Sequence, residues 1–136
     1  MAHTTNYFDT FIAVAEDSPT DHGVEPPVKA DPTIAALHYE LIASAPYTRR
    51  SDDVIFETYA LRAGIAEADR PAAREAFFSK GQPCLRSSPL GKRYGWGIHS
   101  DAEGRVALVA AESDEYARLA ADEANAQTRA MRSRRA

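Results

Sequence analysis

The stretch YGWGIHSDAEGRVALVAA, residues 94–111, decides the fold. Residues 94–99 and 105–111 contain the aromatic and β-branched side chains that are typical of strands, so two strands are predicted. The tetrapeptide DAEG at 101–104 predicts a hairpin connection between them. The run NYFDTFIAVA at 6–15 has a similar composition and predicts a buried strand near the start. Together these patterns predict a small antiparallel sheet made of the N-terminal strand and the hairpin.

About four helices are predicted around this sheet. A capping residue or an early proline marks each start, and glycine or proline marks the end of the first three. Asp31 and Ser51 are the expected caps of the first two helices, and a short turn is expected after Ser87 or Ser88, with Pro89 at its first position. The run VIFETY also suits a strand, but helix is favoured because both end signals agree. We expect the helices at residues 31–45, 51–63, 69–80 and 113–131, the last with a basic end that frays.

The order of these elements indicates an α+β fold, in which helices cover one face of the sheet. A chain of 136 residues has the length of one domain, so a single domain over 1–136 is expected. Four prolines at 17–32 predict a long loop after the first strand. Three helices followed by a hairpin also occur in winged-helix domains, and a winged-helix-like arrangement is the alternative.

The charge of the chain is unevenly distributed. The formal net charge is −4, yet residues 76–100 contain no acid and four of the lysines and arginines. Such a local excess of positive charge matters to partners more than the total does. There is one cysteine and no apolar run long enough to span a membrane. These features predict a cytoplasmic protein with no membrane contact.

Motifs for the common cofactors and metals are missing. There is no P-loop and no H-E-x-x-H helix, and a single cysteine excludes a cysteine-rich zinc site. The four histidines are scattered, and His38 is interpreted as a boundary residue of a helix and not as a ligand. We therefore expect no cofactor and no metal.

The segment KGQPCLRSSPLGKRYGWGIH, residues 80–99, is the leading candidate for a binding site. Arginine can bind a phosphate or carboxylate through two hydrogen bonds, lysine adds positive charge, and aromatic rings can stack on a base or ring. The same residues also suit a buried tryptophan beside a solvated basic edge. The predicted partner is an anionic or aromatic small molecule, or a nucleic acid. The candidate ligand-binding residues are Lys80, Arg86, Ser88, Lys92, Arg93, Tyr94 and Trp96.

Two other functions remain open. Cys84 and His99 are the only possible thiol–imidazole pair, and they would make the protein an enzyme if the thiol has a depressed pKa and the imidazole acts as base. A free cysteine is more often a small buried hydrophobic residue. The third possibility is a structural or protein-interaction role, with a homodimer as one form and the final helix with its arginine-rich end as the contact.

Four blocks of the sequence resemble a known family. They are TTNYFDTFIAVAED, SDDVIF, FFSKGQPCLRSSPLGKRYGWGIHSD and AMRSRRA, and they extend from Thr4 to Ala136. In these blocks the chain is similar to a family of small uncharacterised bacterial and fungal proteins, a domain of unknown function. The resemblance implies a single-domain architecture and implies no activity.

Overall fold

Strand β1 (Thr10–Ala13) lies inside a four-stranded sheet in the computed structural model, which describes residues 3–133. Strand β2 (Trp96–Ser100) pairs antiparallel with β1, and β3 (Val106–Ala110) pairs antiparallel with β2. On its other side β1 pairs parallel with β4 (Ala126–Arg129). The α+β class and the predicted antiparallel set of three strands are confirmed. The hairpin lies within a mixed sheet of order β3-β2-β1-β4, and the winged-helix alternative stays a prediction.

The end of the chain differs from the sequence-based prediction. The expected helix at 113–131 is only α5 (Asp114–Ala121), which the predicted cap Ser113 begins by accepting a hydrogen bond from the amide of Tyr116. Residues 126–129 then form β4, whose side chains are mostly exposed. This short polar strand exists because β1 offers backbone partners to it, and no pattern in its own residues predicts that pairing. The predicted basic end lies partly in β4, while Arg134 and Arg135 fall outside the described residues.

The hairpin forms as the sequence predicts. Asp101 Oδ1 accepts hydrogen bonds from the amides of Glu103 and Arg105, both at 2.9 Å. Gly104 takes a left-handed conformation with φ of 83°, which glycine adopts without steric cost. The turn therefore sets the register of β2 against β3, in which Ile98 lies opposite Leu108.

Two helices begin and end close to their predicted limits. Helix α1 (Ile34–Ala43) is capped by Thr33, not by Asp31, because the Thr33 hydroxyl accepts from the amide of Ala36 at 3.1 Å. Helix α2 (Ser51–Ala63) confirms helix over strand for residues 54–59, and the following Gly64 is left-handed with φ of 68°. The expected cap Ser51 is instead the first helical residue and is fully buried.

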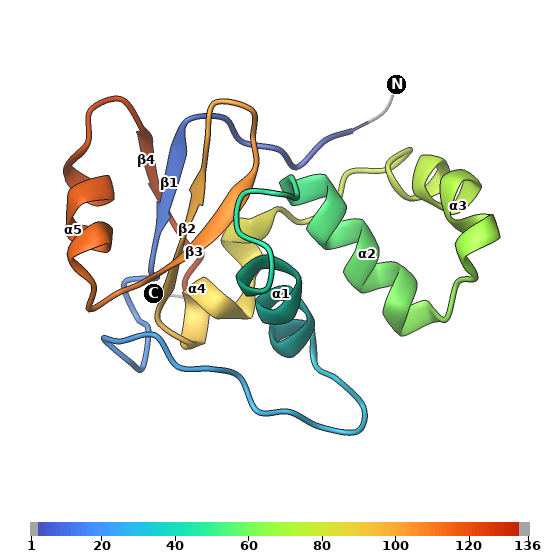
Figure 1. The fold of residues 1–136 in the computed structure, drawn as a ribbon, viewed down its shortest axis with the longest axis horizontal. Coiled ribbons are helices and arrows are strands. Elements are labelled where there is room, and N and C mark those ends of the chain that lie inside the picture. Colours follow the sequence, from blue (N-terminus) through green and yellow to red (C-terminus); the bar gives the residue numbers. More distant parts are fainter. Residues whose placement is uncertain (1–2, 134–136) are drawn as a thin grey trace.

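Apolar side chains cover both faces of the sheet, so the molecule has helices on both sides (Figure 1). One face packs against α1, α2 and the 85–90 region, and the other packs against α5. The sequence predicts helices on one face of the sheet, whereas the structure has helices on both faces. The first core contains Ile12, Ile42, Val54, Leu85, Ile98 and Val106; the second contains Phe11, Val109 and Leu119.

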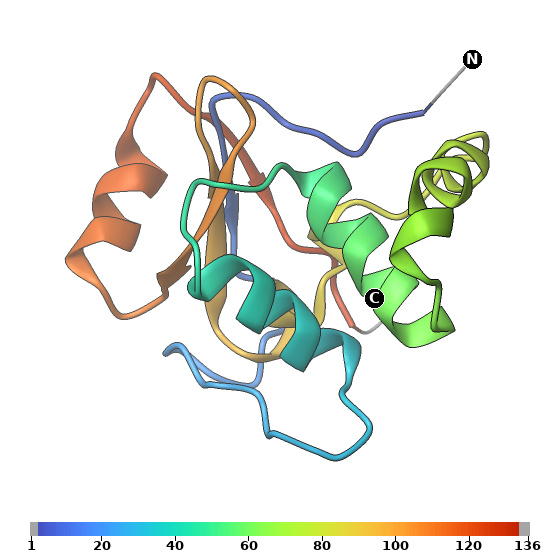
Figure 2. The same cartoon turned by 45° about the vertical axis from the view of Figure 1, so that its right-hand side comes forward.

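A helical extension packs on α2 away from the sheet (Figure 2). It consists of η1 (Glu67–Asp69) and α3 (Arg70–Phe77), so the third helix is shorter than the predicted 69–80. Phe56, Ala60 and Phe78 form its core. The chain then returns through η2 (Leu85–Ser87) to α4 (Pro89–Arg93), where Ser88, the second of the two predicted starts, is the cap and Pro89 is the first helical residue.

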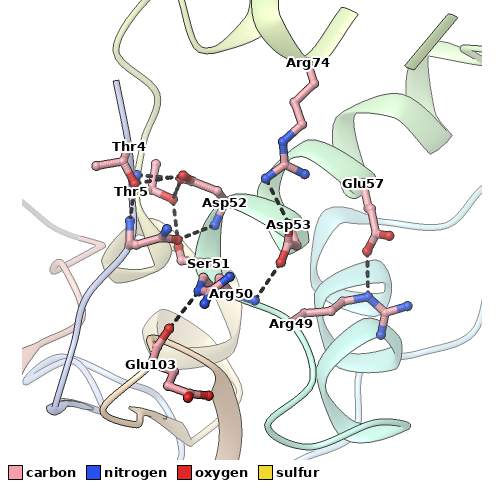
Figure 3. A network of polar contacts seen from close by, with 11 residues as sticks. Thr4, Thr5, Arg49, Arg50, Ser51, Asp52, Asp53, Glu57, Arg74 and Glu103 are labelled. Atoms are coloured by element: carbon pink, nitrogen blue, oxygen red, sulfur yellow. Dashed lines mark hydrogen bonds and ion pairs between the residues drawn. The ribbon is translucent and has the colours of Figure 1, made fainter. Parts of the chain in front are cut away.

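Polar contacts hold the start of α2 in place (Figure 3). Asp52 accepts hydrogen bonds from the backbone of Thr5 at 2.6 Å and from the Thr4 hydroxyl at 2.8 Å. Asp53 accepts from the amide of Arg50 at 2.9 Å and forms an ion pair with Arg74 of α3 at 2.9 Å. These contacts join α2 to the N-terminal segment and to α3, which positions the helix that forms one wall of the cavity described below.

The proline-rich loop packs against the first residue of β2, Trp96, and forms a hydrogen bond with it. The indole of Trp96 donates to the carbonyl of Val24 at 2.9 Å, and its ring lies 5.6 Å from the ring of Tyr39. Gly95 has φ of 75°, and a Cβ there would lie 2.0 Å from the carbonyl oxygen of His22. The loop therefore approaches so closely that only glycine fits at 95. Within residues 3–133, no helix has the length and apolar character needed to cross a membrane.

Candidate functional site

A cavity of about 720 Å³ lies between α1, α2 and the chain segment 82–89. We call it the α1–α2 cavity. One wall is aromatic: the rings of Tyr59 and Phe77 stack with centroids 4.7 Å apart. Buried polar residues form another part of its lining, and the exposed residues Asp31 and Arg62 lie at its rim. The size is within the usual range of small-molecule sites.

His38 is the most buried titratable side chain in this lining, with 6% of its surface exposed. Its Nδ1 lies 2.8 Å from Ser88 Oγ, and Ser88 Oγ also accepts from the amide of Leu90 at 3.3 Å. Burial lowers the pKa of His38 to about 4, so the imidazole is neutral at pH 7. A neutral histidine here presents one nitrogen to Ser88 and the other to its surroundings.

Thr58 of α2 has an unusual polar group. The residue is 5% exposed and lines the α1–α2 cavity, yet its Oγ1 has no hydrogen-bond partner among the described residues. Most buried hydroxyls are hydrogen-bonded, because leaving one without a partner costs free energy. The Oγ1 atom itself is covered, so the unsatisfied hydroxyl lies inside the wall of the cavity.

A second cavity, of about 370 Å³, adjoins the first. The two share Ile34, Arg62 and Pro89 as lining residues. We call it the basic cavity, because Arg62, Lys92 and Arg93 line it and no acid does. Across residues 3–133, none of the ion pairs engages these three cations. Their charge is therefore available to an anion, and Asp31 is the one acidic residue that lines either cavity.

Cys84 lines the α1–α2 cavity and is partly exposed. Its Sγ lies 3.2 Å from the hydroxyl of Tyr7. Burial, together with the hydrogen bond to Cys84, raises the pKa of Tyr7, so the phenol remains protonated at pH 7. The thiol therefore has a neutral neighbour and not a base.

His99 lies on the other side of the sheet. It is opposite Phe11 in the β1–β2 register, and Phe11 belongs to the core under α5. Its Nδ1 is 2.9 Å from the Tyr47 hydroxyl and its Nε2 is 3.2 Å from Asn125 Oδ1. In the described residues no hydrogen bond joins Cys84 to His99. The structure therefore does not bring the predicted thiol–imidazole pair together.

The predicted ligand-binding residues are divided between the cavities and other sites. Ser88 lines the α1–α2 cavity, and Lys92, Arg93 and Tyr94 line the basic cavity. Lys80 is exposed and lines neither. The remaining two are engaged elsewhere: Arg86 Nε donates to the carbonyl of Arg129 at 2.7 Å, and Trp96 holds the proline-rich loop. A binding role for the set of seven stays a prediction.

Sequence reasoning missed the helical side of the site. His38 was interpreted as a boundary residue, and Thr58, Tyr59 and Arg62 were not singled out. A signal existed in the spacing, because residues four apart on a helix share one face. Ile34 with His38, and Thr58 with Arg62, have that spacing, but it predicts a shared face and not a cavity.

Metal ligands do not gather in the part of the chain that the structure describes. Among residues 3–133 there is no group of three or more histidine, cysteine, aspartate or glutamate side chains arranged to hold a metal ion.

Comparisons with known proteins identify the family of this chain and nothing about its activity. No curated protein matches the chain, and no solved structure matches it. One family model, described as a family of unknown function (DUF6157), matches residues 2–136. This match covers nearly the whole chain and confirms the resemblance that the sequence blocks indicated. The protein therefore belongs to DUF6157, a family of unknown function.

Proposed function

We propose that this protein is a binding module for small anionic molecules with an aromatic body. The observation that carries the proposal is the junction of two different cavities. One has a stacked aromatic wall, and the other has three cations that form no ion pair with any residue of 3–133. A ligand spanning the junction buries a ring against Tyr59 and Phe77 and places its anionic group beside Arg62, Lys92 and Arg93.

The charge balance at the junction favours an anion. Three cations face one acid, Asp31, because His38 is neutral at pH 7. Guanidinium groups bind carboxylates and phosphates through paired hydrogen bonds. The aromatic wall adds apolar contact, which is the main source of affinity in small-molecule sites. Carboxylates and phosphate monoesters of aromatic compounds both meet these requirements.

A small ligand fits these features better than the other functions considered. Nucleic acid binding needs an extended basic surface, and the chain has a formal net charge of −4. An enzyme that uses Cys84 with His99 needs the two side chains in contact, and their hydrogen-bond partners lie on opposite sides of the sheet.

The test is calorimetric titration of the purified protein with 3-phenylpropanoate and phenyl phosphate at pH 7. We expect Lys92→Ala/Arg93→Ala to weaken binding at least tenfold, because a charge-assisted hydrogen bond contributes roughly 1.5–3 kcal/mol. The matched control is Lys29→Ala/Lys80→Ala, which removes the same charge from exposed sites outside both cavities. Equal affinity in the two double variants would mean that the basic cavity does not hold the anion.

A further inference from the structure

The basic cavity is where the proposed function places the acid group of the ligand, which can be a carboxylate or a phosphate monoester. At pH 7 a carboxylate has a single negative charge shared by two oxygens. A phosphate monoester has a charge of about −1.5 to −2 and three strong acceptor oxygens. The charge around the basic cavity and the elements that supply its donors therefore distinguish the two acids.

The positive charge of the basic cavity comes from two helices. Arg62 lies in the last turn of α2, and Lys92 and Arg93 lie at the end of α4. None of the three forms an ion pair with a residue of 3–133, and no acid lines this cavity. One carboxylate would leave two of these charges unbalanced, whereas a phosphate dianion would leave one. The charge of the cavity thus favours the phosphate.

A third helix adds a backbone donor to these cations. Thr33, Ile34 and Ala35, the cap and first residues of α1, also line the basic cavity. The Thr33 hydroxyl accepts from the amide of Ala36, whereas the amide of Ile34, an exposed residue, donates to no described residue. The first turn of α1 contains no acidic residue, and the peptide dipoles give the start of a helix a partial positive charge. An anion held by the three cations therefore gains a neighbouring N–H donor.

The arrangement of these donors suits a tetrahedral group better than a planar one. Helix α1 packs against both α2 and α4, and residues of all three helices line the basic cavity. The two oxygens of a carboxylate lie in one plane and match a single guanidinium group. The free oxygens of a phosphate monoester point in three directions, so each can accept hydrogen bonds from a different helix.

We propose that the ligand is a phosphate monoester of an aromatic compound, bound as the dianion by Arg62, Lys92 and Arg93 with the amide of Ile34 as a further donor. The proposal rests on the proposed function, because it takes the basic cavity as the anion site and the aromatic wall of the α1–α2 cavity as the ring site. It assigns Arg62 and the start of α1 as the parts of the site that distinguish phosphate from carboxylate.

The first experiment compares three compounds by calorimetry on the unmodified protein at pH 7.5: phenyl phosphate, methyl phenyl phosphate and 3-phenylpropanoate. Methyl phenyl phosphate keeps the ring and the phosphorus but has one charge and two free oxygens. We expect phenyl phosphate to bind at least about tenfold more tightly than either of the others, since it alone is a dianion with three free oxygens.

The second experiment removes the backbone donor. Proline suits the first position of a helix and has no N–H, and Thr33 before it already has the extended conformation that proline requires, with ψ of 164°. Ile34→Pro and Ile34→Ala both remove the isoleucine side chain, but only the first removes the amide N–H. We expect phenyl phosphate to bind several-fold more weakly to Ile34→Pro than to Ile34→Ala. Melting temperature confirms that both variants are folded.

The third experiment removes one cation. Arg62→Ala should weaken the binding of phenyl phosphate about tenfold and that of 3-phenylpropanoate less, because the phosphate has the larger charge. The matched control is Lys80→Ala, which removes the same charge from an exposed residue outside both cavities. An equal loss for the two compounds in Arg62→Ala would overturn the assignment of Arg62.

The outcomes separate this inference from the proposed function. Equal affinities for phenyl phosphate and 3-phenylpropanoate, both weakened by Lys92→Ala/Arg93→Ala, would overturn the inference and leave the proposed function in place. Equal affinities for phenyl phosphate and its methyl ester would also overturn it, because the dianion would then have no advantage. Equal affinity of phenyl phosphate for Ile34→Pro and Ile34→Ala would overturn the role of the amide. Absence of binding by all three compounds would reject both proposals.

Discussion

Two histidines on opposite sides of the sheet have contrasting surroundings. His99, beneath α5, is partly exposed, and both of its ring nitrogens have partners, Tyr47 and Asn125. His38, beside α2, is buried, and one nitrogen is bonded to Ser88 while the other has no partner among the described residues. The more exposed histidine is thus the more fully satisfied one.

This contrast shows that accessibility alone does not identify a site. A side chain whose hydrogen bonds are complete already serves the fold, as His99 does by joining the α1–α2 connection to the segment before β4. A buried donor or acceptor without a hydrogen-bond partner has lost its contact with water and gained no bond in exchange, which costs free energy. Buried side-chain atoms without a partner occur on both sides of the sheet among the described residues, at Thr58 Oγ1 and at Asn125 Nδ2. It is therefore the adjoining cavity that favours the His38 region as a candidate for binding.

The largest expected effect comes from removing each imidazole in turn. His38→Ala should lower the free energy of unfolding by about 3 kcal/mol, because it leaves a cavity and removes the acceptor of the Ser88 proton. His99→Ala should cost about 2 kcal/mol, because Tyr47 is partly exposed and can bond to water instead, while the buried Asn125 Oδ1 loses its partner. Urea unfolding of the two variants measures the difference. Equal losses of unfolding free energy in the two variants would mean that the His38 and His99 regions contribute alike to stability.

A pH titration of stability sharpens the same comparison. His38 has a native pKa of about 4 and an unfolded pKa near 6.5, so between these values the unfolded chain binds a proton that the native protein does not. Stability should therefore fall as pH decreases, by about 2 kcal/mol between pH 7 and pH 5 from this residue. Below about pH 3 both states bind the proton, and the contribution of His38 no longer changes.

The control for this titration is His38→Gln, which cannot titrate. Urea unfolding at pH 7 and pH 5 should show a smaller loss of stability in this variant than in the unmodified protein. The same loss in both proteins would mean that His38 is not held neutral in the folded state.

The smallest expected effect concerns the unsatisfied hydroxyl. Thr58→Val replaces a buried hydroxyl without a partner by a methyl group of similar size, so stability should rise by up to about 1 kcal/mol. The matched control is Thr10→Val, because Thr10 is equally buried but its hydroxyl donates to the Phe8 carbonyl at 2.8 Å. That variant should lose about 1 kcal/mol. A loss in Thr58→Val, measured by thermal unfolding, would show that its hydroxyl has a partner in the folded protein.

The parts of the fold that the sequence predicted are those with local chemical signals. The Asp101–Gly104 turn, the Ser113 and Ser88 caps, and the left-handed Gly64 all act within a few residues of their own positions. The β4 strand has no such signal, because its partner β1 is more than a hundred residues earlier in the chain. Its prediction as helix followed from local propensity, which tertiary pairing overrides.

The candidate site was predicted in part for the same reason. Lys92, Arg93 and Tyr94 are adjacent in the chain, so their shared basic and aromatic character is visible in the sequence. His38 and Ser88 are 50 residues apart, and their contact depends on the packing of α1 against α4. Trp96 and Arg86 have the same residue types as the binding set, but they bond to the backbone of distant segments that sequence patterns do not reveal.

The order in which the strands are made has a consequence for synthesis. Strand β1 leaves the ribosome first, but its two neighbours follow only at residues 96–100 and 126–129. Phe11 and Ile12, which are fully buried in the finished protein, must remain unpaired on the nascent chain until then. Such a chain completes its sheet late, and its apolar first strand is a natural binding segment for chaperones during translation.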